Sequence, residues 1–221
     1  MAKTDPAATA AALPGDENAA ESLVEWVRAN SKTVSIGGMV IVAAAAIGLL
    51  WRASAEKKEV RASESLAAAQ AVVQSGNVAL AQSDLTTMIR RYGDTKAGMQ
   101  ARLLLTQILF GQDKVEDGLR ELEAVGPREP YTASYHGLKA AGLEQSGKPA
   151  EAAAEFERAA TAAGTDLAKA SYQSDAARTY LVAGNRDAAL RIWEAMAADD
   201  ANPLAGEAKV RVGELKAKPI G

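Results

Sequence analysis

The sequence predicts an all-α protein in which a single N-terminal transmembrane helix is followed by an α-solenoid of about four helix pairs and a capping helix. Three observations predict this fold class. Residues 34–51 form an uncharged apolar stretch. After residue 55 the chain is rich in alanine and poor in β-branched and aromatic residues, a composition that favours helix over strand. The same spacing of turn, small and large apolar residues then occurs four times along the chain.

The apolar stretch at 34–51 reads VSIGGMVIVAAAAIGLLW. A helix of this length spans about 27 Å, close to the thickness of the hydrocarbon core of a bilayer. One alternative is a buried helix of a soluble core, which would normally keep a polar face. Another is a cleaved signal peptide, because residues 53–55 (ASA) have an accepted cleavage form, but the apolar run is longer than a typical signal core. We therefore expect an uncleaved transmembrane helix over 33–52.

The chain before the span divides into two parts. Residues 1–17 are rich in Ala, Pro and Gly without an apolar period, so we expect a disordered tail, placed in the cytoplasm by the topology discussed below. Residues 18–32 place apolar residues among Glu25 and Arg28, and we expect a short interfacial helix with Trp26 at headgroup level. A simple helical lead-in to the span fits the same residues.

The span itself carries two further features. Trp51 and Arg52, like Trp26, are residue types that anchor a helix at the membrane surface. Small residues at Gly37, Ala44 and Gly48 would let a neighbouring transmembrane helix approach closely, although Ala44 and Gly48 also fit as lipid-facing filler.

The repeat is anchored on a turn residue. A small residue follows five positions later, a large apolar residue four after that, and a small or apolar residue three further on. The turn residues Gly76, Asp113, Gly147 and Gly184 are separated by steps of 37, 34 and 37 residues. The residues that follow them in this pattern are Ala81, Leu85 and Met88; Gly118, Leu122 and Val125; Ala152, Phe156 and Ala159; Ala189, Trp193 and Met196.

This period and these residues resemble the tetratricopeptide repeat, in which small positions let two helices pack closely and large ones fill the gap to the next pair. The first helices carry Ala69, Thr106, Ala140 and Ala177 at the small position. The second copy is degenerate, with Arg102 where the family prefers Trp. The resemblance implies a tetratricopeptide-like solenoid over 62–203, reached through a helical connector at 53–61 and closed by a capping helix and tail at 204–221.

In such a solenoid the first helices form the inner face, which serves as a protein-binding groove. The residues at the corresponding register positions are Gln70, Gln74, Gln100, Gln107, Phe110, Gln145 and Arg178. Repeat domains that clamp a C-terminal carboxylate use several Lys, Arg and Asn residues at these places, so that mode is not expected. The alternative is that the glutamines merely solvate an unused groove.

Other chemistry finds little support, and we expect no enzyme, catalytic residue, cofactor or metal site. The chain lacks cysteine and has one histidine, which excludes thiolate catalysis and a multi-histidine metal centre. Gly142 to Lys148 have the spacing of a phosphate-binding loop, but Pro149 stands where the motif requires Ser or Thr. The formal net charge of −3 and the scattered cations give no case for nucleic acid binding.

The whole layout resembles the YfgM-type ancillary subunits of the SecYEG translocon. The lead-in ESLVEWVRANSK, a Gly- and Ala-rich span ending in Trp-Arg, a helical connector and the repeats carry this resemblance. It implies a single-pass protein of the bacterial inner membrane with a cytoplasmic N-terminus and a periplasmic repeat domain. It also implies a chaperone-like role, with the translocon, a membrane-anchored isomerase-like chaperone and secreted polypeptide clients as partners.

Two points stay open. Lys and Arg are fewer before the span than after it, where Arg52, Lys57, Lys58 and Arg61 lie, and this bias favours a cytoplasmic C-terminal domain. Long domains, however, translocate largely regardless of flanking charge. The same layout also suits a scaffold of another kind, a structural or assembly subunit of a respiratory or photosynthetic inner-membrane complex.

Overall fold

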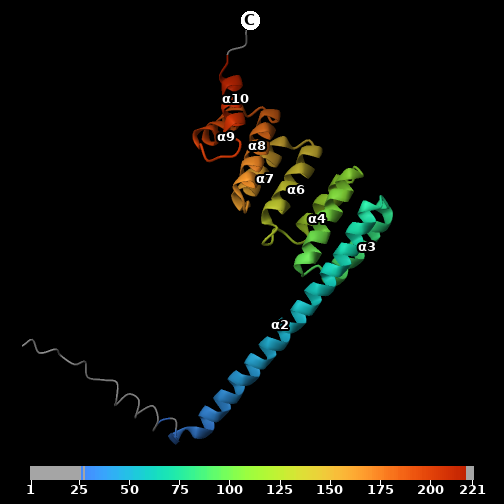
Figure 1. Ribbon diagram of the computed structural model, residues 1–221, viewed down its shortest axis with the longest axis vertical. Helices are drawn as coiled ribbons and strands as arrows, with labels where there is room; N and C mark the ends of the chain where they lie inside the picture. Colours follow the sequence, from blue (N-terminus) through green and yellow to red (C-terminus); the bar gives the residue numbers. More distant parts are fainter. Residues whose placement is uncertain (1–25, 27, 218–221) are drawn as a thin grey trace, which may run out of the picture. The chain divides into compact units, whose positions relative to one another are not determined.

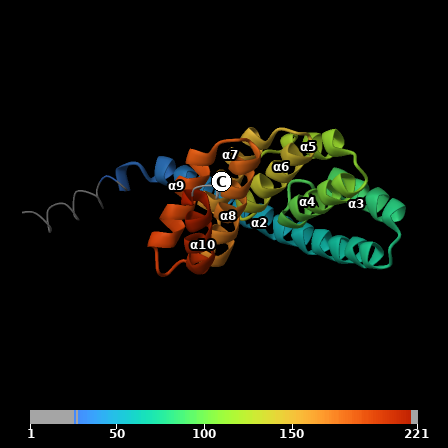
Figure 2. The ribbon, with the colours of Figure 1, turned by 90° about the horizontal axis from the view of Figure 1, so that it is seen from above.

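The computed structural model describes residues 26 and 28–217, and within them the chain forms nine helices and no strand. The predicted all-α fold is therefore confirmed. The chain divides into two units, Met1–Glu56 and Lys57–Gly221. The helices, labelled in Figure 1 apart from α5, which Figure 2 labels, are α2 (Ser31–Gln74), α3 (Val78–Tyr92), α4 (Lys96–Gly111), α5 (Val115–Glu123), α6 (Thr132–Gln145), α7 (Pro149–Ala162), α8 (Asp166–Val182), α9 (Arg186–Ala198) and α10 (Ala205–Lys216). The tail expected at 1–17 and most of the interfacial helix expected at 18–32 lie outside the described residues.

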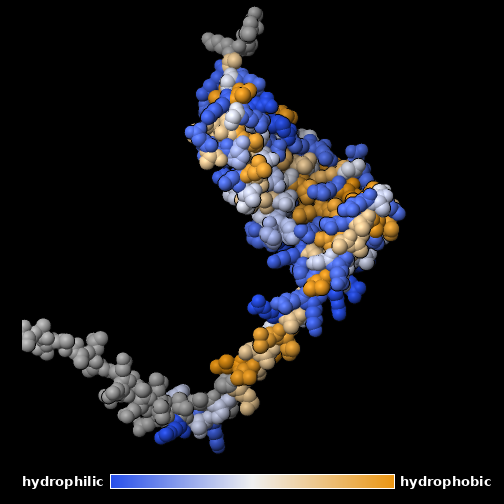
Figure 3. All heavy atoms as spheres, in the orientation of Figure 1, coloured by the Kyte–Doolittle hydropathy of each residue, from blue (hydrophilic) through white to orange (hydrophobic). Residues whose placement is uncertain are grey.

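The first unit contains the apolar part of α2. The side chains from Met39 to Trp51 are exposed along this stretch, and their apolar surface is visible in Figure 3. Within the described residues, Met39–Gln74 is the one helical stretch that is long and apolar enough to cross a membrane. Exposure of so many large apolar side chains to water is unfavourable, whereas a lipid environment removes that cost. This unit is thus compatible with a single-pass membrane protein.

In the second unit the helices follow one another in chain order as pairs, and Figure 2 gives the same stack from above. Two residues after the end of each first helix lies a residue with positive φ: Gly76 (79°), Asp113 (60°), Gly147 (71°) and Gly184 (76°). These are the four turn residues that the sequence predicts. The left-handed conformation costs glycine little and is tolerated by aspartate. After Gly147, the Lys148 N–H donates to the Leu143 carbonyl at 2.9 Å, the hydrogen bond that closes a helix in a Schellman motif.

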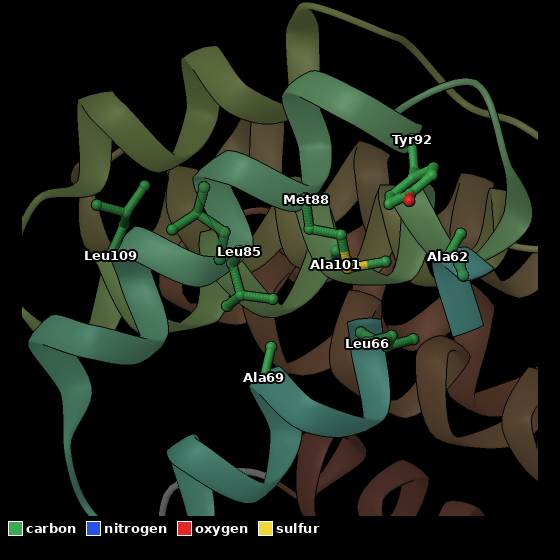
Figure 4. Packing of buried hydrophobic residues seen from close by; sticks show 10 residues of the cluster. Ala62, Leu66, Ala69, Leu85, Met88, Tyr92, Ala101 and Leu109 are labelled. Carbon is green, nitrogen blue, oxygen red and sulfur yellow. The ribbon is translucent and has the colours of Figure 1, made fainter. Parts of the chain in front are cut away.

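The packing follows the predicted register. The small first-helix residues are all buried, at 2% exposure for Ala69 and 0% for Thr106, Ala140 and Ala177. Around Ala69, the core of the first repeat joins α2, α3 and α4, as Figure 4 shows. Its members come from these three helices: Ala62, Leu66, Ala69, Leu85, Met88, Tyr92, Ala97, Ala101, Leu105 and Leu109. Small residues therefore allow close helix contact while large ones fill the space between pairs.

The second repeat departs from the pattern in two ways. Its second helix, α5, has only 9 residues, and Arg102 pairs with the Glu121 carboxylate at 2.5 Å instead of supplying an aromatic side chain to the core. Phe110, which we expected on the inner face, is instead buried with 7% exposure. The cause is two glycines: a Cβ on Gly118 or Gly142 would lie 2.5 or 2.6 Å from the Phe110 ring. Their missing side chains leave the space that draws Phe110 into the core.

Polar contacts join the beginning of the second unit, at Lys58 and Glu59, to the turn between α3 and α4. Lys58 Nζ lies 2.6 and 2.7 Å from the two carboxylate oxygens of Asp94. The next residue, Glu59, accepts the backbone N–H groups of Lys96 and Ala97, each at 2.9 Å. Thr95 Oγ1 accepts the Gly98 N–H at 2.9 Å. The first N–H groups of α4, which have no partner within the helix, are thereby satisfied.

Candidate protein-binding groove

A hollow of about 450 Å³ lies on the face formed by the first helices of the repeats. This volume falls in the range of about 300–1,000 Å³ that is typical of binding pockets. Its lining residues come from α2, α4, α6 and α8 and from Tyr131, which directly precedes α6. We call this hollow the inner groove; it is lined by Gln70, Gln100, Leu103, Leu104, Gln107, Tyr131, Ser134, Gly137, Leu138 and Tyr172.

None of the residues that line the inner groove is charged, although 24% of the chain is Asp, Glu, Lys or Arg. The lining combines amide, hydroxyl and phenol groups with the side chains of three leucines. By contrast, four smaller hollows in the described residues each include charged side chains; one of about 340 Å³, for example, is bordered by Glu157, Lys169 and Arg191. The inner groove therefore combines apolar contact area with neutral hydrogen-bonding groups.

Two tyrosines give the groove its aromatic surface. Burial raises the pKa of Tyr131 above 10, the neighbouring Glu59 carboxylate raises it further, and a hydrogen bond with Gln100 opposes both. Burial likewise raises the pKa of Tyr172, with Asp175 adding to the effect and a hydrogen bond with Ser134 opposing it. Both phenols are therefore neutral at physiological pH and can donate as well as accept a hydrogen bond.

The expected groove residues divide into two groups. Three of them, Gln70 on α2 and Gln100 and Gln107 on α4, line the groove and have exposed side chains. Gln74 and Gln145 are exposed but lie outside its lining. The structure therefore brings together three of the five glutamines, and their role in binding stays a prediction.

Arg178, the cation expected on this face, forms ion pairs with two carboxylates. Its guanidinium lies 3.2 Å from Glu144 and 3.7 Å from Asp175. Glu144 also accepts a hydrogen bond from the buried Thr179 hydroxyl at 2.9 Å. Burial raises the pKa of Asp175, the positive charge of Arg178 lowers it, and Glu144 raises it again. Arg178 belongs to this network and not to the lining of the inner groove.

Sequence reasoning missed most of the apolar and aromatic lining. Leu103 and Leu104 lie three and four residues after Gln100, on the same side of α4. That spacing would have pointed to them. Tyr131, Ser134 and Tyr172 carried no comparable signal, because the loop before α6 and the space beside Gly137 are set by the packing of the helices.

The residues expected to pack or anchor the membrane helix remain predictions. Gly48 has no neighbouring atom within 4 Å of the position of a Cβ, and Ala44 is exposed. Gly37 lies within α2, but its surroundings are outside the described residues. Trp26 and Trp51 are 58% and 78% exposed, and Arg52 forms an exposed ion pair with Glu56 at 3.5 Å. These groups are open to lipid or to a partner.

The single histidine takes part in a polar cluster between α6 and α7. His136 Nδ1 lies 2.6 Å from Glu155, a carboxylate with 5% exposure that also contacts Arg158 at 2.6 Å and Lys139 at 3.6 Å. Such a buried acid needs these partners to offset its desolvation. Among residues 26 and 28–217, no three His, Asp or Glu side chains are placed to hold a metal ion.

Residues 62–176, just over half of the chain, match the family described as tetratricopeptide repeat-like domain. The chain belongs to this family. Its repeat fold is typically a non-catalytic scaffold for protein–protein interaction. No curated protein matches the chain.

Proposed function

We propose that this protein is a membrane-anchored scaffold that binds polypeptides in its inner groove, acting as an ancillary, chaperone-like subunit of the secretion translocon. The observation that carries the proposal is the inner groove: an uncharged hollow shared by the first helices of four successive pairs. A solenoid face of this kind suits an extended polypeptide, which can contact several repeats at once.

The exposed apolar stretch of α2 supports the membrane-anchored part of the proposal. In this proposal the stretch crosses the bacterial inner membrane, with the N-terminus in the cytoplasm and the repeats in the periplasm. The secreted clients would then meet the groove as they leave the translocon, and a membrane-anchored isomerase-like chaperone would work beside it. The topology rests on resemblance, because the Lys and Arg count around the span points the other way.

Reporter fusions at the C-terminus test the topology. Alkaline phosphatase is active only after export, so an active fusion supports a periplasmic repeat domain. A fusion to a fluorescent protein that folds in the cytoplasm should then remain dark. An inactive phosphatase fusion together with a fluorescent cytoplasmic fusion would place the repeats in the cytoplasm. That result would contradict the proposed action on secreted clients.

A second candidate function is a structural or assembly subunit of a respiratory or photosynthetic complex. The open surroundings of Gly48 and the exposure of Ala44 favour it, because small residues at these positions admit a close-packed partner helix. In that case the span, and not the inner groove, makes the main contact.

Purification of the full chain from membranes in mild detergent separates the two functions. We expect co-purification of translocon subunits and of an isomerase-like chaperone. Stoichiometric recovery of a respiratory or photosynthetic complex would contradict the translocon role. In parallel, a variant with leucine at Gly37, Ala44 and Gly48 should still insert; loss of the co-purified proteins would show that the span makes the contact, and unchanged recovery would show that it is only an anchor.

A further inference from the structure

We propose that the inner groove selects uncharged internal segments of extended polypeptides and discriminates against acidic segments and free C-terminal carboxylates. This inference rests on the proposed function, since it assumes that the groove binds polypeptides. It goes further by defining the chemistry of the segment that binds.

The first argument is the charge of the lining. A carboxylate placed in the inner groove would lose water and find no lining cation, and an unpaired charge removed from water is costly. Arg178, on the same helix as Tyr172, does not supply the missing charge because Glu144 and Asp175 already pair with it.

The carboxylates next to the groove act in the same direction. Glu59 is close enough to Tyr131, and Asp175 to Tyr172, to raise the pKa of each phenol. The Glu59 position is fixed by the two N–H groups of α4 that it accepts. Glu59, and the one negative charge that two acids leave in excess around Arg178, disfavour an acidic segment while leaving neutral ones unaffected.

The second argument is hydrogen bonding. The backbone of an extended segment presents N–H and C=O groups that have no internal partners. Each of Gln70, Gln100 and Gln107 offers both a donor and an acceptor on one amide, so the three can pair with either backbone group. Leu104 and Leu138 offer contact area for apolar side chains. Nothing in this chemistry requires the end of a chain.

The binding experiment uses the full chain in nanodiscs and ten-residue peptides labelled with an uncharged dye on a side chain. The reference peptide is acetylated, amidated and built from Ser, Thr, Val and Leu. A second peptide has two Asp in place of two Ser, and a third has a free C-terminal carboxylate. We expect the reference peptide to bind, the Asp peptide to bind at least about tenfold more weakly, and the free-carboxylate peptide also to bind more weakly than the reference. Equal or tighter binding of either the Asp peptide or the free-carboxylate peptide would overturn the inference.

A pair of charge variants locates the effect. Gln107→Lys places a cation in the inner groove and should restore binding of the Asp peptide by about tenfold. Gln145→Lys makes the same change at an exposed position outside the lining and should leave both affinities unchanged. An equal gain from both variants would contradict selection in the groove.

This experiment and the co-purification fail independently. Selective peptide binding without translocon subunits in the detergent eluate would refute the proposed translocon role and support the inference. Translocon recovery with no binding of any of the three peptides would refute the inference and leave that role standing.

Discussion

The ring of Tyr172 on α8 occupies the space beside Gly137 on α6, where a Cβ would lie 2.7 Å from Tyr172 Cε1. Both residues line the inner groove. The absence of a side chain at Gly137 therefore lets an aromatic ring from the next repeat reach the groove. This contact joins the third and fourth repeats at the site that we propose binds polypeptides.

Gly137→Ala should weaken peptide binding without unfolding the repeats. The new methyl group displaces the Tyr172 ring, while alanine in a helix gains about 0.5–1 kcal/mol over glycine and offsets much of the strain. Fluorescence anisotropy with the neutral peptide and thermal unfolding followed by circular dichroism measure the two effects. The control is Gly213→Ala in α10, where a Cβ meets nothing within 4 Å, so stability should rise and binding should not change. Equal binding by Gly137→Ala and the parent would contradict the role of this contact.

Glu59→Ala should destabilise the repeat unit, because two N–H groups at the start of α4 lose their acceptor. Loss of a cap typically costs about 0.5–2 kcal/mol. For a chain of this size that corresponds to a fall in the melting temperature of about 1–8 °C. Glu56→Ala is the control, since the Glu56 carboxylate forms an exposed pair with Arg52 and its removal should cost under about 0.5 kcal/mol. Similar melting temperatures for both variants would show that Glu59 is not needed as a cap.

The pair of Lys58 and Asp94 predicts a defined pH dependence. The hydrogen bond from Lys58 holds the pKa of Asp94 below its ordinary value of 3.8. Because the folded pKa is the lower one, the stabilisation is present above about pH 4 and is lost as the pH falls through the folded pKa. Asp94→Asn should therefore lower the free energy of unfolding at pH 7, by less than about 1 kcal/mol for so exposed a pair. The difference should vanish in acid; a difference that stays constant down to pH 3 would contradict the assignment.

Phe110→Ala should strongly destabilise the protein, although the sequence places Phe110 among the groove residues. Its ring fills the space beside Gly118 and Gly142, and truncating a buried phenylalanine typically costs about 3–5 kcal/mol. Gln107→Ala, three residues earlier on the exposed side of α4, should change stability by less than about 0.5 kcal/mol. Thermal unfolding of the two variants distinguishes a core residue from a surface one. A mild effect of Phe110→Ala would contradict a role of Phe110 in the core.

The fold was accessible from the sequence because its determinants are local and periodic. The turns are marked by Gly76, Asp113, Gly147 and Gly184, which are residue types that tolerate the left-handed backbone conformation. All four have positive φ. The small residues Ala69 and Ala140 mark the close contacts between helices and are buried. Each of these signals depends on spacing along the chain, which the sequence displays directly.

The groove was only partly accessible, because its shape depends on contacts between repeats. Register alone places Gln70, Gln100 and Gln107 on the inner face. The burial of Phe110 depends on two glycines from other helices, and the place of Tyr172 depends on a third, Gly137. Missing side chains on a neighbouring helix leave no periodic signal, so they could be recognised only once the helices were seen together.

The central claim is that the inner groove contacts polypeptides in the membrane-anchored protein, and site-specific photocrosslinking in cells tests it most directly. A photoreactive amino acid replaces Gln107 inside the groove or Gln145 outside it, in the full chain. We expect crosslinks to secreted polypeptides from position 107 and few from position 145. Equal crosslinking from both positions, or none from position 107 while the protein remains folded in the membrane, would contradict the claim.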